Sequence, residues 1–391
     1  MRSTAIKLSA VLTLLLGGVA TVRAQDSINV VTTAVPFLRI SPDARAGGMG
    51  DLALATSPDA SSSFFNLGKV AFNTSPSAVN VTYTPWLKKL VNDVYLASIA
   101  GYFKIDELQA VSGSLRYFSL GNIQFTDQYG QLQGEGRPRE FGVDIGYSRK
   151  LTDRTGLGVG LKYINSDLAS GAAGQGGQTY KAGNAVAADL GFYHNRQTED
   201  GQGWAFGVAL TNLGSKIAYT DNADQKDFIP ANFGIGTTYT RVLDESNKIS
   251  FGVDVNKFLV PTPPRLSDPV ALEDYRSKGV LSSWFSSFGD APGGFSEELK
   301  EFQISAGAEY WYNNQFALRA GYFYEDETKG NRRYFTTGVG IKYNVFGLNF
   351  SYLVPSGGAG SNQNPLSNTL RFSLIFDLDG SSSDGVESAD Q

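Results

Sequence analysis

The chain has 391 residues, a formal net charge of −5 and no cysteine. Without cysteine it can form no disulfide, no thiolate metal site and no lipid-modified cysteine anchor. The weak acidic balance, with no basic block, argues against nucleic acid as a ligand. The counts of 45 glycines, 19 tyrosines and 25 phenylalanines against two methionines favour bent strands and aromatic belts over a soluble α/β enzyme.

The first residues are typical of a secretory signal peptide. Arg2 and Lys7 give a positive start, and an apolar run follows over residues 8–20. This run is too short to span a bilayer as a helix, and Val22-Arg23-Ala24 resembles a cleavage site. We therefore expect residues 1–24 to be removed. The alternative is a retained membrane anchor.

The next segment, residues 25–77, lacks strand-like alternation over most of its length and contains Gly47-Gly48-Met49-Gly50. We predict a compact piece with a turn or two of helix, lying in or under the domain that follows. The glycines permit positive φ and close backbone packing. We expect Asp43 to pair with Arg45, and Asp59 to cap a short helix that ends near Asn66.

From residue 78 to residue 378 the chain alternates between an apolar and a polar face. Phe141-Gly142-Val143-Asp144-Ile145-Gly146-Tyr147 is typical. In an exported protein this pattern predicts an all-β transmembrane fold: a 14-stranded antiparallel barrel with lipid outside and a polar lumen inside. The predicted strands cover residues 78–86, 92–104, 107–120, 138–150, 154–167, 179–193, 203–213, 229–241, 247–259, 300–312, 315–327, 333–344, 346–355 and 366–378.

The connections between these strands alternate between short and long. Outer-membrane barrels have short periplasmic turns and long extracellular loops. We therefore predict an outer-membrane location, an even strand number and both termini in the periplasm. The alternative, a soluble β-sandwich, has shorter and fewer strands.

The longest loop, residues 260–299, contains an apolar patch with Trp284, Phe285 and Phe288. Loops of this length are uncommon unless they are functional or disordered. Exposed aromatic residues favour contact with a partner or a membrane. The alternative is that these rings fold down and cap the barrel mouth. The tail, residues 379–391, is rich in serine and acid, and we predict it to be disordered.

Catalytic chemistry has little support. His194 is the only histidine, so a Ser–His–acid site would have to use it. We predict no catalytic residue, no cofactor and no metal, and hence no enzyme. Strand parity places charges of both signs in the lumen, which indicates internal salt bridges: Asp144, Lys162, Asp189, Asp254, Glu309, Arg319, Lys342, Arg371 and Asp377.

The N-terminal segment resembles the signature of the PorV (LptO) family, type IX secretion proteins of the Bacteroidetes outer membrane, within the FadL-like barrels. The resemblance is sharpest over residues 33–71 and covers essentially the whole mature chain. The residues that carry it are Pro42, Asp43, Arg45, Gly47, Gly48, Met49, Gly50, Asp59 and Asn66.

This resemblance implies a FadL-like barrel whose N-terminal segment plugs the lumen. It also implies a shuttle. Such proteins receive cargo with a C-terminal secretion domain from the SprA (Sov) translocon and carry it to the PorU sortase, which attaches it to lipopolysaccharide. The chain departs from FadL proteins at Asn66-Leu67-Gly68, where they have Asn-Pro-Ala. The alternative function is a channel for hydrophobic small molecules. An apolar pocket in the lumen would favour the channel. A plugged polar lumen together with an apolar outer loop would favour the shuttle.

Overall fold

The computed structural model describes residues 29–86, 93–126, 129–170, 179–221, 226–264, 269–356 and 369–378. The predicted signal peptide and the predicted disordered tail lie outside these described residues. Within them, no helix combines the length and the apolar character needed to cross a membrane.

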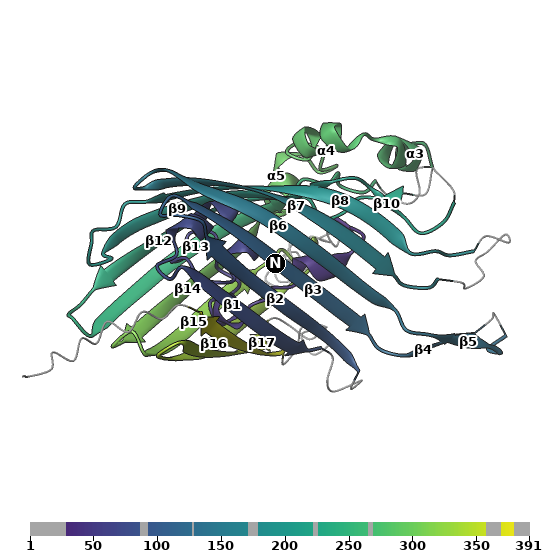
Figure 1. The fold of residues 1–391 in the computed structure, drawn as a ribbon. Helices are drawn as coiled ribbons and strands as arrows, with labels where there is room; N and C mark the ends of the chain where they lie inside the picture. Colours follow the sequence, from purple (N-terminus) through teal and green to yellow (C-terminus); the bar gives the residue numbers. More distant parts are fainter. Residues whose placement is uncertain are drawn as a thin grey trace, which may run out of the picture.

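Fourteen strands close into one antiparallel barrel (Figure 1). This confirms the predicted fold class, and the strand ends agree with the prediction to within about four residues. The barrel strands are β1 (Ser77–Pro85), β2 (Val94–Lys104), β3 (Gln109–Leu120), β6 (Arg139–Thr152), β7 (Thr155–Asp167), β8 (Gly183–Asn195), β9 (Gly203–Gly214), β12 (Asn232–Val242), β13 (Asn247–Phe258), β14 (Gln303–Tyr312), β15 (Phe316–Tyr324), β16 (Arg333–Tyr343), β17 (Phe346–Pro355) and β18 (Leu370–Asp377).

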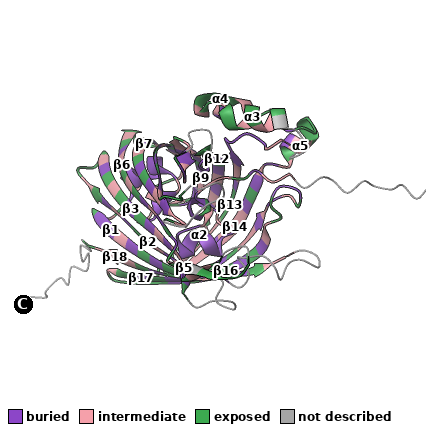
Figure 2. Cartoon of the chain, turned by 90° about the vertical axis from the view of Figure 1, so that its right-hand side faces the viewer, coloured by how far each residue is buried: buried purple, intermediate pink, exposed green. Residues whose placement is uncertain are grey.

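Burial alternates along the strands as a barrel in lipid requires. On β8 the apolar side chains of Val186, Leu190 and Phe192 are exposed on the outside, and the carboxylate of Asp189 is buried on the inside. The stripes of alternating burial are visible in Figure 2. Because a charge facing lipid is costly at mid-depth, the charges collect in the lumen.

All the long connections lie at one end of the barrel, which we call the long-loop end, and the other is the short-turn end. The hairpin of β4 (Ile123–Thr126) and β5 (Leu132–Gly136) extends from the long-loop end (Figure 1). So does the small pair β10 (Ile217–Ala218) and β11 (Lys226–Asp227). The β13–β14 connection carries α3 (Pro269–Ser277), α4 (Val280–Ser286) and α5 (Phe295–Leu299).

Residues 29–76, which we call the lumen segment, pack against the inner side of the barrel wall. Their short helices are η1 (Pro36–Arg39), α2 (Ala44–Gly48), η2 (Ser62–Phe64) and η3 (Leu67–Phe72). Helix α2 packs against β15 to β18, whereas η3 packs against β3, β6, β7 and β8 on another part of the wall. Figure 2 shows α2 within the ring of strands.

The lumen segment runs from one end of the barrel to the other, so the first and last described residues lie at opposite ends. The predicted periplasmic location of both chain termini concerns residues outside the described ones and stays a prediction. The backbone N–H of Asn29, the first described residue, donates to the carbonyl of Thr328 in the β15–β16 connection, at the long-loop end. Leu378, the last described residue, donates to the carbonyl of Ser77 at the short-turn end. The alternation of short and long connections predicts only at which end of the barrel β1 begins and β18 ends. It carries no signal for the extra pass that the lumen segment makes.

Candidate functional site

Helix α2 begins at Asp43, whose side chain ties the helix to the barrel wall. The Asp43 carboxylate accepts from the backbone N–H of Ala46 at 2.9 Å, as an N-cap does. It also accepts from the side-chain amide of Asn80 on β1 at 3.2 Å. The preceding carbonyl, of Pro42, accepts from the hydroxyl of Ser98 on β2 at 2.7 Å. This start of the helix is therefore fixed to two neighbouring strands.

Arg45 pairs with Glu309 and Asp59, not with Asp43 as expected. Its guanidinium donates to both carboxylate oxygens of Glu309, at 2.7 and 2.9 Å, and to Asp59 at 2.8 Å. Arg319 donates to the same Glu309 at 2.7 Å, and Arg45, Glu309 and Arg319 are all buried. Strand parity predicted that Glu309 and Arg319 face the lumen. Nothing in the sequence indicated that Arg45 of the lumen segment joins them. A bidentate pair of this kind orients α2 as well as holding it.

The glycines after Arg45 let backbone approach backbone. A Cβ on Gly48 would lie 3.2 Å from the Cα of Gly338. Gly50 has φ +71°, and a Cβ there would lie 2.7 Å from the backbone of Tyr322. The prediction of close packing is met at these two positions, and positive φ is needed only at the second.

Asp59 and Asn66 each organise a turn. Asp59 accepts from the backbone N–H of Ser61 at 3.0 Å, so it precedes η2 instead of capping it. Asn66 caps η3, because its side-chain oxygen accepts from Gly68 N–H at 3.0 Å. The Asn66 amide also donates to the carbonyls of Leu54 and Phe192, both at 2.9 Å. Asn66 thus joins two parts of the lumen segment to β8.

Two buried charges that sequence reasoning did not connect hold the bend between α2 and η2. Asp254 on β13 accepts from the backbone N–H groups of Ala53 and Leu54, at 2.7 and 2.9 Å. The ammonium of Lys69 donates to the carbonyl of Ala53 at 2.7 Å. Lys69 was not singled out, since nothing local in the sequence marks a lysine as buried.

The other lumen charges also find partners. Lys162 pairs with Asp144 at 3.1 Å and with Asp189 at 3.0 Å. Lys342 and Asp377 pair at 2.9 Å, although Lys342 is half exposed. Charges of mixed sign therefore form internal salt bridges, as parity indicated.

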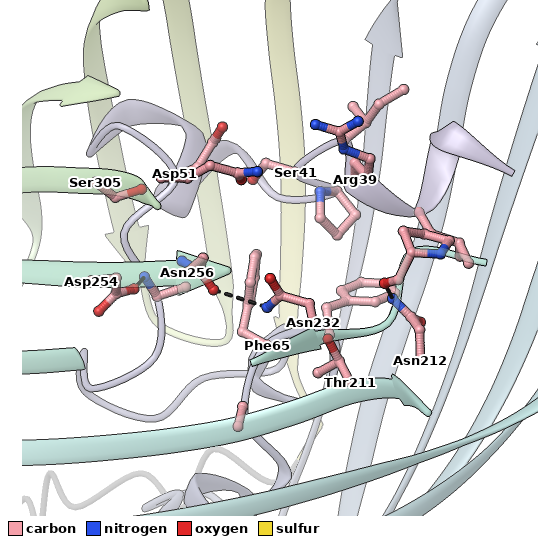
Figure 3. Close-up of a pocket in the computed structure, with 18 of the residues that line it drawn as sticks. Arg39, Ser41, Asp51, Phe65, Thr211, Asn212, Asn232, Asp254, Asn256 and Ser305 are labelled. Carbon is pink, nitrogen blue, oxygen red and sulfur yellow. Dashed lines mark hydrogen bonds between the residues drawn. The ribbon is translucent and has the colours of Figure 1, made fainter. Parts of the chain in front are cut away.

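A cavity of about 140 Å³ remains between the lumen segment and the barrel wall. Figure 3 shows its polar lining, in which the amides of Asn232 and Asn256 are hydrogen bonded at 3.0 Å. Arg39, Arg116, Asp51 and Asp254 line it as well, beside Phe65 and other apolar side chains. The lining of this cavity is therefore mixed, with polar and apolar side chains in similar measure.

The three predicted aromatic residues of the long loop lie on or just after α4. Phe285 is 80% exposed, Phe288 is about half exposed and Trp284 is partly buried. The Phe288 ring packs edge-on against Phe233, an outward-facing residue of β12, with centroids 6.2 Å apart. Leu281, Phe285 and Phe288 share one helical face. We call Leu281, Trp284, Phe285 and Phe288 the outer-loop patch.

The outer-loop patch contacts the outer side of the barrel wall through Phe288. Figure 2 shows α3 and α4 outside the ring of strands. The Phe288 ring contacts Phe233 of β12, and the ammonium of Lys257 on β13 lies 5.8 Å from its centroid. Phe288 therefore packs beside β12, and the two alternatives for the patch as a whole stay predictions.

A buried ion network anchors this loop to the barrel rim. The ammonium of Lys257 on β13 is fully buried and lies 2.6 Å from both Glu298 and Glu301. Lys329 pairs with Glu297 at 2.6 Å and with Glu301 at 3.0 Å. Although Asp290, Glu298 and Glu301 lie close together, their charges are met by lysines, so we assign no metal to them.

Known proteins resemble this chain in different degrees. No curated protein matches it. Among solved structures, the Ralstonia pickettii toluene transporter TbuX has 12% identity and a TM-score of 0.48, covering 86% of this chain and 96% of its own. The Pseudomonas putida toluene transporter TodX has 11% identity and a TM-score of 0.48, covering 84% and 95%. A Pseudomonas aeruginosa FadL homologue has 12% identity and a TM-score of 0.47, covering 90% and 100%.

The family comparison agrees with the resemblance of the N-terminal motif. The family model described as "Type IX secretion system protein PorV" matches residues 23–265. This stretch includes the whole lumen segment and the barrel from β1 to β13. Because the match covers more than half of the sequence, the chain belongs to the PorV family of type IX secretion system proteins.

Proposed function

We propose that this protein is a non-enzymatic cargo shuttle of type IX secretion in the outer membrane. In this proposal it receives cargo with a C-terminal secretion domain from the SprA (Sov) translocon and delivers it to the PorU sortase for attachment to lipopolysaccharide. Family membership supports the secretion role. The observation that carries the shuttle is the combination of a filled polar lumen with an apolar patch outside the barrel.

The filled lumen favours a carrier over a pore. The lumen segment is held by Glu309, Asp254 and the backbone contacts of its glycines. A passage would require these buried contacts to break. We therefore propose that the motif from Pro42 to Asn66 acts as a plug, and that residues 25–77 form it after cleavage at Ala24. The barrel then comprises residues 78–378, followed by the tail 379–391.

The outer-loop patch is suited to hold a protein. Large aromatic residues at the centre of an interface typically contribute about 2 kcal/mol or more each when truncated. The Lys257 network holds the loop in place before a partner arrives. Less ordering entropy is then lost on binding. We propose that the long-loop end faces the cell exterior, where cargo emerges.

The test compares two exposed aromatics at opposite ends of the barrel. Phe285→Ser should weaken co-purification of translocon and cargo from mild detergent, and the triple variant W284S/F285S/F288S should weaken it further. Tyr343→Ser is the matched control, because Tyr343 is 75% exposed at the short-turn end. The melting temperature should stay unchanged for both single variants. Undiminished co-purification with the triple variant would refute a partner-binding role for the patch.

A further inference from the structure

We infer that the long-loop end contains a groove for an extended peptide, and that residues 29–34 of this chain occupy it. We call these residues the strap. The strap has no helix or strand. Its backbone is bonded to two separate connections: Asn29 N–H donates to Thr328 at 3.0 Å, and Ala34 N–H donates to Phe228 at 2.9 Å. The Asn29 side-chain amide also donates to Glu297 of α5 at 3.4 Å.

One side chain of the strap enters an apolar pocket. Val31 is buried in a cluster with Phe228, Phe258 and Val260. Tyr275 of α3 and Val280 of α4 pack against this cluster from above. The pocket therefore lies under the loop that carries the outer-loop patch. Main-chain hydrogen bonds with a pocket for one side chain are a recurring mode of peptide recognition.

The walls of the groove are held without the strap. Phe258 belongs to β13, where it pairs with Asn232 of β12 in the barrel ladder. Lys257 and Lys329 fix the far wall through Glu297, Glu298 and Glu301. A groove whose walls stand independently is preformed for another segment when the strap leaves.

The strap is also separable from the rest of the lumen segment. The next residue, Val35, is fully buried in a different cluster with Phe37 and Leu38. It has φ +48°, a strained conformation for a β-branched residue. The strained φ of Val35 persists because its own core over-determines it, so residues from Val35 onward are held independently of the strap.

The occupant that fits in place of the strap is an extended segment of a protein partner. It needs free backbone N–H groups, an aliphatic residue for the Val31 pocket, and an amide or cation two residues earlier to meet Glu297. This inference does not depend on the secretion role, because purified protein and a peptide suffice to test it.

Because the chain has no cysteine, a single introduced cysteine is the only thiol that can react with a maleimide. Val31→Cys is prepared in the full chain in detergent, and its reaction with a maleimide is timed. The added peptide has the sequence Asn-Val-Val-Thr-Thr-Ala-Val-Pro of residues 29–36, and the control peptide carries Asp in place of Val31. We expect the first peptide to raise the labelling rate at least tenfold and the control peptide to leave it unchanged.

A second measurement covers the case in which the cysteine itself loosens the strap. Val31→Asp should expel the strap while the barrel keeps its heat-modifiable migration, because Val31 lies outside the strand ladder. A fluorescently labelled form of the peptide of residues 29–36 should then bind this variant at least tenfold more tightly than it binds the parent protein. If the peptide neither exposes Cys at position 31 nor binds Val31→Asp, the groove does not exist, and the secretion role is untouched.

Discussion

Gly50 shows how much a single residue of the motif must satisfy. It combines a positive φ with backbone of Tyr322 so close that a Cβ would lie at 2.7 Å. Gly201, in the β8–β9 turn, has a similar φ of +87° but open space around it. The two glycines therefore separate the effect of conformation from the effect of packing.

We predict that Gly50→Ala destabilises the barrel more than Gly201→Ala. Both variants pay about 1 kcal/mol for an alanine in the left-handed region. Gly50→Ala adds a steric clash of about 1–3 kcal/mol. Denaturant unfolding monitored by heat-modifiable migration gives both values. Equal losses in the two variants would show that the backbone contact with Tyr322 is unimportant.

At the scale of elements, α2 depends on one carboxylate of the barrel wall. Glu309 on β14 is buried between Arg45 of α2 and Arg319 of β15. Removing one member of a buried ion pair leaves its partners without a counter-charge. The helix and two strands therefore share a single electrostatic centre.

We predict that Glu309→Gln costs about 3 kcal/mol of unfolding free energy, at the lower end for a broken buried pair, because Arg45 keeps Asp59. It should also open the lumen segment to protease, since α2 loses its link to β14. Glu107→Gln is the control, because Glu107 pairs with Lys104 on the surface and should not change stability. A protease-resistant lumen segment in Glu309→Gln would mean that the glycine contacts alone hold α2.

The same elements show what the sequence could and could not predict. The barrel strands were predictable because alternation is local and every strand repeats it. The partner of Arg45 was not, since Arg45 and Glu309 are 264 residues apart. We expected Arg45 to pair with Asp43 because Asp43 is only two residues away in the sequence. The position of the outer-loop patch was also beyond reach, because it depends on Phe233 and on the Lys257 network, which tertiary contacts create.

For the whole molecule, the pass of the lumen segment through the barrel joins the two ends. Asn29 lies among the long loops and Ser77 begins β1 at the short-turn end. The strap, the plug motif and the first strand thus follow one another along the chain from the long-loop end to the short-turn end. The strap is the part of the lumen segment that contacts the connections of the long-loop end.

The orientation of this line in the membrane is the last prediction. Outer-membrane barrels place short turns in the periplasm and long loops outside. Because the chain has no cysteine, Ser282→Cys in α4 and Asp153→Cys in the β6–β7 turn report on opposite ends, and both residues are exposed. On intact cells a membrane-impermeant maleimide should label Ser282→Cys within minutes and Asp153→Cys only after the outer membrane is permeabilised. The reverse pattern would place the outer-loop patch in the periplasm, where it could not meet cargo at the cell surface.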